Sequence, residues 1–142
     1  MKLKIFGIST NPVALDAVLL LIRLVTGFAF MHHGWGKIQH PMNWMGEGSS
    51  YPGIFQALSA VAEFIGGSAL VLGFLTRIAA FGIVCNMLVA LHVHIFVKGD
   101  PFVNVKGGSS YELALVFLVI AILFLIMGPG RYSLDRLVFG KD

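Results

Sequence analysis

Charged residues are scarce in this sequence of 142 residues. Asp, Glu, Lys and Arg make up 12% of the chain, about half of the roughly 25% that is usual in soluble domains. A soluble domain of this size has a large surface to cover with polar groups, and so few charges cannot cover it. The composition therefore argues against a soluble monomer. Hydrophobic residues form 57% of the chain, which excludes intrinsic disorder.

Cysteine and basic runs are also nearly absent. The single cysteine, Cys85, excludes an intramolecular disulfide, a CxxC redox pair and a cysteine zinc cluster. The net charge of +3 is spread along the chain and forms no basic run, so we expect no nucleic acid as a partner. No ExxH pair occurs, which argues against a di-iron carboxylate bundle, and we expect no metal site.

Long apolar runs are present instead. Four of them cover residues 13–31, 54–75, 78–97 and 111–127, which gives lengths of 17 to 22 residues. A helix needs about 17–25 residues to cross the hydrocarbon core of a bilayer. Glycine and proline interrupt the chain between the runs, except for a short turn at residues 75–77. The sequence predicts an all-α fold, a single membrane domain built as a bundle of four transmembrane helices.

Basic residues predict the orientation of this bundle. Four spans place both termini and the 75–77 turn on one side of the membrane. Lys2, Lys4, Arg77, Arg131, Arg136 and Lys141 belong to that side, and Lys37, Lys98 and Lys106 to the other. Cytoplasmic loops carry the excess of Lys and Arg, so we expect both termini in the cytoplasm.

Three polar residues fall near the middle of their spans: Arg23, Glu63 and Asn86. Charges at that depth are costly, and they usually face the bundle interior and pair with one another. Arg23 and Glu63 are the obvious pair, with Asn86 as a hydrogen-bond partner. Such a buried polar core either fixes helix register or takes part in binding a polar head group or moving protons.

A second polar layer follows the outward ends of the spans. We expect His33, Lys37, His92 and Glu112 to lie at this level as candidates for binding a ligand or carrying protons. Imidazoles carry protons near neutral pH, and a quinone head group would find histidine and carboxylate donors here. A b-type haem would need one histidine from each of two facing helices, and the spacing supports it less well. Plain interfacial histidines remain the alternative.

Several short strings resemble the DoxX family of small four-helix membrane proteins. These strings keep the order and spacing of that family over about residues 15 to 137: His33-Gly34-Trp35-Gly36-Lys37, Glu63 with Gly66-Gly67, Leu75-Thr76-Arg77, and Gly128-Pro129-Gly130-Arg131-Tyr132-Ser133-Leu134-Asp135. The family's recurrent polar positions match Arg23, Lys37, Glu63, Arg77, His92 and Glu112.

The resemblance implies a multi-pass protein of a prokaryotic cytoplasmic, or inner, membrane. Some members are the small subunit of a thiosulfate:quinone oxidoreductase, and others are linked to thiol or oxidative-stress redox complexes. We therefore expect a redox-associated subunit that interacts with the quinone pool, with a partner redox subunit or a second copy of the chain as further partners. The alternatives are a non-enzymatic scaffold or partner that recruits a redox enzyme, and a small-molecule or proton-coupled transporter.

Overall fold

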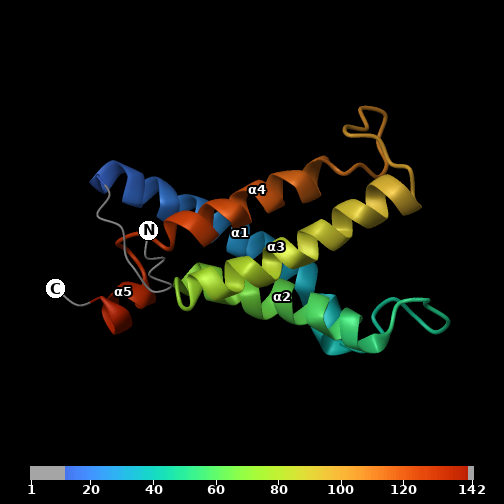
Figure 1. Cartoon of the computed structure of the whole chain (residues 1–142), viewed down its shortest axis with the longest axis horizontal. Coiled ribbons are helices and arrows are strands. Elements are labelled where there is room, and N and C mark those ends of the chain that lie inside the picture. The colour runs from blue at the N-terminus through green and yellow to red at the C-terminus, as the bar shows by residue number, and fades with distance from the viewer. Residues whose placement is uncertain (1–11, 141–142) are drawn as a thin grey trace.

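The structure is a computed structural model that describes residues 12–140 of the chain. Within these residues the chain is helical and contains no strand. Its elements are α1 (Val13–Gln39), α2 (Gly53–Leu72), α3 (Thr76–His92), the π-helical turn η1 (Val93–Val97), α4 (Glu112–Met127) and α5 (Leu134–Phe139). The four long helices run roughly along one axis, with α5 at one end and the two longer loops at the other (Figure 1).

Three of the helical stretches are long and apolar enough to cross a membrane. They are Val13–Gln39, Gly53–Leu72 and Thr76–Val97, the last of which joins α3 to η1. Helix α4 is apolar but has 16 residues, which at about 1.5 Å per residue gives roughly 24 Å. It is therefore a shorter member of the predicted four-helix membrane bundle.

The distribution of side chains is that of a membrane protein. Leu21, Val25, Phe81, Val119 and Ile126 are each more than half exposed, and they come from three different helices. Soluble proteins rarely expose so many large apolar groups over a continuous surface, whereas lipid tails cover them at no cost. The outer surface thus faces lipid, and several polar side chains lie inside the bundle.

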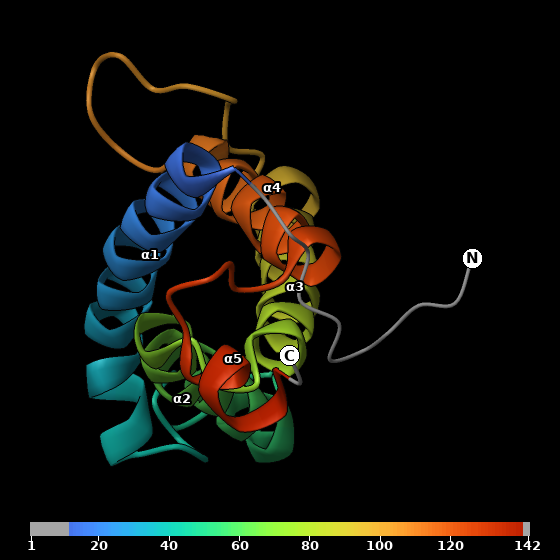
Figure 2. The same cartoon turned by 90° about the vertical axis from the view of Figure 1, so that its left-hand side faces the viewer.

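Helices α1 and α2 form the closest pair, because glycines stand at their contact. A Cβ atom built on Gly27 would lie 2.7 Å from the carbonyl oxygen of Gly67, and one on Gly34 would lie 2.5 Å from the backbone nitrogen of Phe64. Small residues allow such close backbone approach in membrane bundles. Helix α3 packs on both α2 and α4, whereas α1 and α4 touch only slightly. Figure 2 shows the four helices around a common axis.

Helix boundaries differ from the expected ones where turn residues decide them. Helix α1 continues past Met31 to Gln39, and it stops just before Pro41, since the residue preceding a proline disfavours the helical conformation. Helix α2 stops at Leu72 because Gly73 adopts the left-handed conformation (φ 66°). The extension of α1 adds two helical turns to the end that carries His33 and Lys37.

The start of α1, the α2–α3 turn and α5 share one end of the bundle, which we call the α5 end. The other end, which carries the loops at residues 40–52 and 98–111, is the loop end. Apart from Arg23 inside the bundle, the described Lys and Arg residues at the α5 end are Arg77, Arg131 and Arg136, and those at the loop end are Lys37, Lys98 and Lys106. Lys2, Lys4 and Lys141 lie outside the described residues.

Candidate functional site

A three-residue polar cluster joins α1, α2 and α3. The ammonium group of Lys37 lies 2.6 Å from Glu63 Oε1, and the amide nitrogen of Asn86 donates to the same oxygen at 2.9 Å. The close approach of Gly34 to Phe64 explains the geometry, because Lys37 follows one turn after Gly34 and Glu63 directly precedes Phe64. The side chain of Glu63 is 6% exposed and that of Lys37 is 23% exposed.

The loop at residues 40–52 supports this cluster. The Lys37 ammonium lies 4.4 Å from the centre of the Trp44 ring, a cation–π contact. The indole of Trp44 donates to the backbone oxygen of Gln56 at 2.9 Å, and the Gln56 side chain binds the backbone of Met45 and Tyr51. Buried Gln56 therefore fixes the loop that holds Trp44 over the lysine.

A pocket of about 420 Å³ opens beside the cluster at the loop end, between all four long helices. Its polar lining comes from His33, Lys37, Glu63, His94, Ser109 and Ser110. Its apolar lining comes from Phe30, Met87, Ala90, Leu113, Ala114 and Phe117. The rings of Phe30 and Phe117 are 4.7 Å apart, and His33 lies edge-on to Phe117 at 6.2 Å. The pocket thus combines an aromatic wall with a buried carboxylate.

The loop at residues 98–111 borders the mouth of this pocket and is fixed by Asp100. Its carboxylate accepts from the hydroxyl of Ser109 and from Nδ1 of His94, each at 2.6 Å. These hydrogen bonds, first from Ser109 and then from His94, lower the pKa of Asp100 below its usual value. Since His94 and Ser109 both line the pocket, Asp100 determines how the loop lies over it.

The expected pairing of Arg23 with Glu63 is wrong. Arg23 is buried, but its guanidinium donates to the backbone oxygens of Pro129 at 2.8 Å and Tyr132 at 2.5 Å, at the α5 end. Glu63 pairs with Lys37 instead. Arg23 and Glu63 both lie near the middle of their apolar runs, but the long arginine side chain reaches the backbone carbonyls of the segment between α4 and α5.

Arg23 belongs to a set of contacts that we call the tail clamp, formed by Asp16, Arg23 and Asp135 with residues 128–135. Asp16 is 1% exposed and accepts from the backbone nitrogen of Arg131 at 3.0 Å. Asp135 accepts from the backbone nitrogens of Leu75 at 2.6 Å and Thr76 at 3.0 Å. The segment after α4 crosses the end of the bundle to make these contacts (Figure 2).

The tail clamp gives a structural role to the two sequence strings that lie at the α5 end, residues 75–77 and 128–135. Asp135 caps the first backbone N–H groups of α3 and holds Leu75 in a left-handed conformation (φ 48°). A Cβ atom on Gly73 would lie 2.6 Å from the Arg23 guanidinium, so glycine is needed there for space as well as for its φ. Arg77 donates to the backbone oxygen of Leu125 at 3.2 Å. These residues hold the bundle together.

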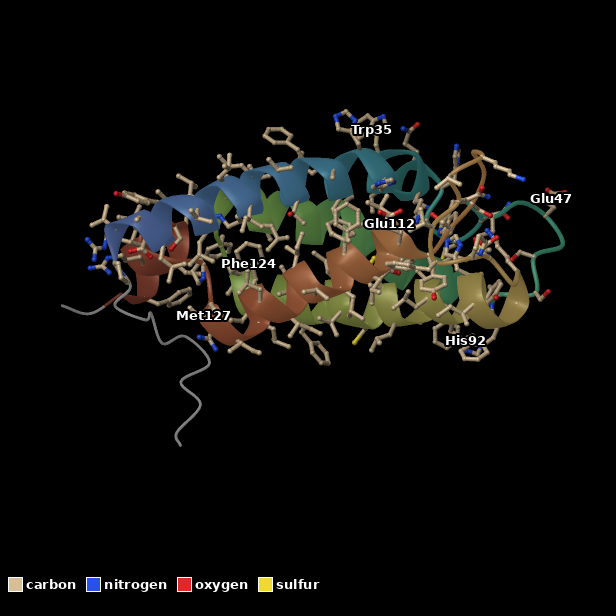
Figure 3. The ribbon with its side chains drawn as sticks, turned by 90° about the horizontal axis from the view of Figure 1, so that it is seen from above. Trp35, Glu47, His92, Glu112, Phe124 and Met127 are labelled. Atoms are coloured by element: carbon tan, nitrogen blue, oxygen red, sulfur yellow. The ribbon has the colours of Figure 1, made fainter. Side chains whose placement is uncertain are left out.

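The predicted ligand residues separate into two groups. His33 and Lys37 line the pocket, and Glu63 lies beside them. His92 is exposed and points away from the bundle (Figure 3), with its ring 5.3 Å from that of Phe96 in a tilted arrangement, so it does not belong to this pocket. Glu112 begins α4 directly before the pocket-lining Leu113, but it is exposed and does not itself line the pocket. Within residues 12–140 no group of three or more His, Cys, Asp or Glu side chains is arranged to hold a metal ion.

Sequence reasoning did not select His94 and Asp100. The signal for His94 was its spacing, because Ile83, Met87, Ala90 and His94 recur every three or four residues and share one helix face. The first two are buried, so this face points inward, and His92 cannot share it. Asp100 gave no signal, since an acidic residue in a glycine- and proline-containing loop is common.

Comparison with known proteins gives consistent matches. The DoxX family matches residues 18–97. The inner membrane protein YqjF of Escherichia coli is 34% identical over 136 residues, which cover 89% of this chain and 95% of that protein. An uncharacterized protein of Haemophilus influenzae is 30% identical over 125 residues, with 87% and 92% covered. An uncharacterized membrane protein of Mycobacterium tuberculosis is 31% identical over 129 residues, with 82% and 78% covered. No solved structure matches the chain.

The family match covers more than half of the chain, and these relatives align over most of their own length. Together with the apolar helices and the lipid-facing outer surface, these matches place the chain in the inner membrane. This chain is a multi-pass bacterial inner-membrane protein and belongs to the DoxX family.

Proposed function

We propose that the protein binds a lipid-soluble quinone or quinol in the pocket at the loop end and serves a redox enzyme as a membrane subunit that meets the quinone pool. The observation that carries the proposal is the position of Glu63, a buried carboxylate that lines a pocket with an aromatic wall. Small-molecule sites combine mostly apolar walls with a few placed polar groups, and this pocket has that composition.

The size and opening of the pocket suit such a ligand. Ligand pockets typically enclose about 300–1,000 Å³, and this one encloses about 420 Å³. That volume accommodates one substituted ring with the beginning of its tail. Because α1 and α4 have few backbone contacts and are joined here by the side chains of Phe30 and Phe117, we propose that the isoprenoid tail passes alongside these two rings into the surrounding lipid.

The polar lining suits proton exchange with the head group. Oxidation of a quinol releases two protons, and imidazoles can carry protons near neutral pH. His33 and His94 line the pocket, and we propose that Glu112, which directly precedes the pocket-lining Leu113, receives protons from them. His92 points away from this pocket and has no part in the proposal.

A binding experiment with two matched variants tests the proposal. Purified protein in lipid nanodiscs is extracted to identify co-purifying quinones and then titrated with short-chain ubiquinone and menaquinone analogues. Ala114→Phe fills the pocket and should abolish binding, whereas Val116→Phe, on the exposed face of the same helix, should preserve it. The absence of both co-purifying quinone and saturable binding to the wild-type protein would refute the proposal, and so would unchanged binding to Ala114→Phe.

A further inference from the structure

The two carboxylate oxygens of Glu63 have unequal surroundings. Oε1 accepts from Lys37 at 2.6 Å and from Asn86 at 2.9 Å. Oε2 is also buried, and no hydrogen-bond donor reaches it from any described residue. Buried polar groups are nearly always hydrogen-bonded, so an unpaired oxygen of a charged carboxylate requires an explanation. One acceptor site of Glu63 is therefore vacant in a residue that lines the pocket.

Other buried polar atoms without a hydrogen-bond partner in the described part of the chain are Asp16 Oδ2, Arg23 Nε and Thr76 Oγ1. None of their residues lines the pocket. Asp16 Oδ2 lies 3.3 Å from Arg131 Nε in an ion pair, and Arg23 uses its two terminal nitrogens in the tail clamp. Glu63 Oε2 differs from them because a ligand can come within reach of its residue.

The chemistry of this oxygen restricts the ligand. In its ion pair with Lys37, Glu63 is an ionised carboxylate, and an ionised carboxylate only accepts hydrogen bonds. The carbonyl oxygens of a quinone also only accept, so a quinone oxygen next to Oε2 would bring two electron-rich atoms together. A hydroquinone carries two hydroxyl groups, and either of them can donate to Oε2 in a charge-assisted hydrogen bond.

We propose that a hydroxyl group of the reduced ligand supplies the missing donor, so that the pocket binds the hydroquinone in preference to the quinone. This inference rests on the proposed function, because it names the redox form that the same pocket selects. The ring of the ligand lies against Phe30 and Phe117, which line the pocket together with Glu63, and one hydroxyl group points to Oε2. The preference arises from this hydrogen bond, since both redox forms offer the same apolar ring and tail.

Binding of the two redox forms to the wild-type protein tests the inference. Protein in nanodiscs is titrated under anaerobic conditions with a short-chain hydroquinone and, separately, with the corresponding quinone. A hydrogen bond to a charged group predicts about tenfold tighter binding of the hydroquinone, or more. Tenfold tighter binding of the reduced form also raises the midpoint potential of the bound two-electron couple by about 30 mV relative to the free couple.

A conservative variant links the preference to Glu63. Glu63→Gln replaces the charged acceptor by an amide that both donates and accepts, so the preference for the hydroquinone should disappear or reverse. Glu47→Gln makes the same change on an exposed residue of the loop at residues 40–52 and should retain the preference (Figure 3). Circular dichroism and size-exclusion profiles compare the folding of the variants, and the wild-type titrations decide the inference even where Glu63→Gln does not fold.

The outcomes separate this inference from the function on which it rests. Binding of both redox forms with equal affinity, or tighter binding of the quinone, would overturn the inference and leave a quinone site in place. A folded Glu63→Gln variant that keeps the full preference would also overturn it. Failure of both forms to bind the wild-type protein would overturn the proposed function and the inference together.

Discussion

Replacement of Gly34 by alanine should push α1 and α2 apart. The new Cβ atom would lie 2.5 Å from the backbone nitrogen of Phe64 and 2.9 Å from its Cα, and ordinary contact begins at 3.4 Å. The helices must therefore separate locally by about 0.9 Å, the difference between 3.4 and 2.5 Å. Overpacking costs about 1–3 kcal/mol, and we expect about 3 kcal/mol because the opposing atoms belong to the backbone.

Gly36→Ala is the matched control for Gly34→Ala. Nothing lies within 4 Å of a Cβ atom at Gly36, which stands two residues further along the same helix. Replacing glycine by alanine in a helix gains about 1 kcal/mol in either variant, so this gain cancels in the comparison. Gly36→Ala should thus be about 1 kcal/mol more stable than the wild-type protein, and Gly34→Ala about 2 kcal/mol less stable.

Unfolding in increasing sodium dodecyl sulfate, followed by circular dichroism, measures the two unfolding free energies. We expect a difference of about 3 kcal/mol between the variants. Binding of the proposed quinone ligand provides a second measurement, because separation of α1 from α2 also moves Lys37 away from Glu63. Equal stability of Gly34→Ala and Gly36→Ala would refute the close contact on which the geometry of the candidate site depends.

Two further predictions concern the ends of the bundle. Asp135→Asn removes a charged acceptor from the N–H groups at the start of α3 and should lower the unfolding free energy by about 2 kcal/mol. Glu47→Gln, at an exposed position, should change it by less than about 0.5 kcal/mol, and equal effects would contradict the capping role. The lowered pKa of Asp100 means that its carboxylate stabilises the loop above its unfolded pKa of about 3.9, and that this contribution is lost as pH falls through the lower folded value. Amide hydrogen exchange of residues 102–110, corrected for its intrinsic pH dependence, should therefore rise only in acid. Ser109→Ala should move that rise to higher pH, and an unchanged onset would contradict the contact.

The helices were predictable from the sequence because lipid imposes one simple requirement on a membrane protein. Every backbone polar group must be paired inside the bilayer, so long apolar runs become helices and their lengths are fixed by the membrane. The ends of the runs were less predictable, since hydrophobicity does not reveal where a helix stops. Helix α1 continues through His32, His33 and Lys37 because no residue breaks it before Pro41.

The partners of the buried charges could not be read from the sequence. The depth of a Cα atom in a span does not fix the position of a long side chain, and the guanidinium of Arg23 reaches the carbonyl of Tyr132, 109 residues away. That contact depends on a non-helical segment whose path across the bundle no periodicity indicates. The pairing of Lys37 with Glu63 depends likewise on the close contact at Gly34. Gly34 belongs to one of the strings that resemble the DoxX family, but that resemblance does not show which helix the glycine contacts.

The two ends of the bundle hold buried charge in different ways, and this difference supports the site that we propose at the loop end. At the α5 end, Asp16, Arg23 and Asp135 each bind backbone groups of a neighbouring segment, so their charges serve to join the tail to the helices. At the loop end, Lys37 and Glu63 bind each other beside a pocket, and no backbone group needs their charge. A buried ion pair costs desolvation and is seldom the best way to stabilise a fold. The loop-end pair therefore supports the proposed binding site, in which the hydroxyl group of a bound hydroquinone would complete the hydrogen bonding of Glu63.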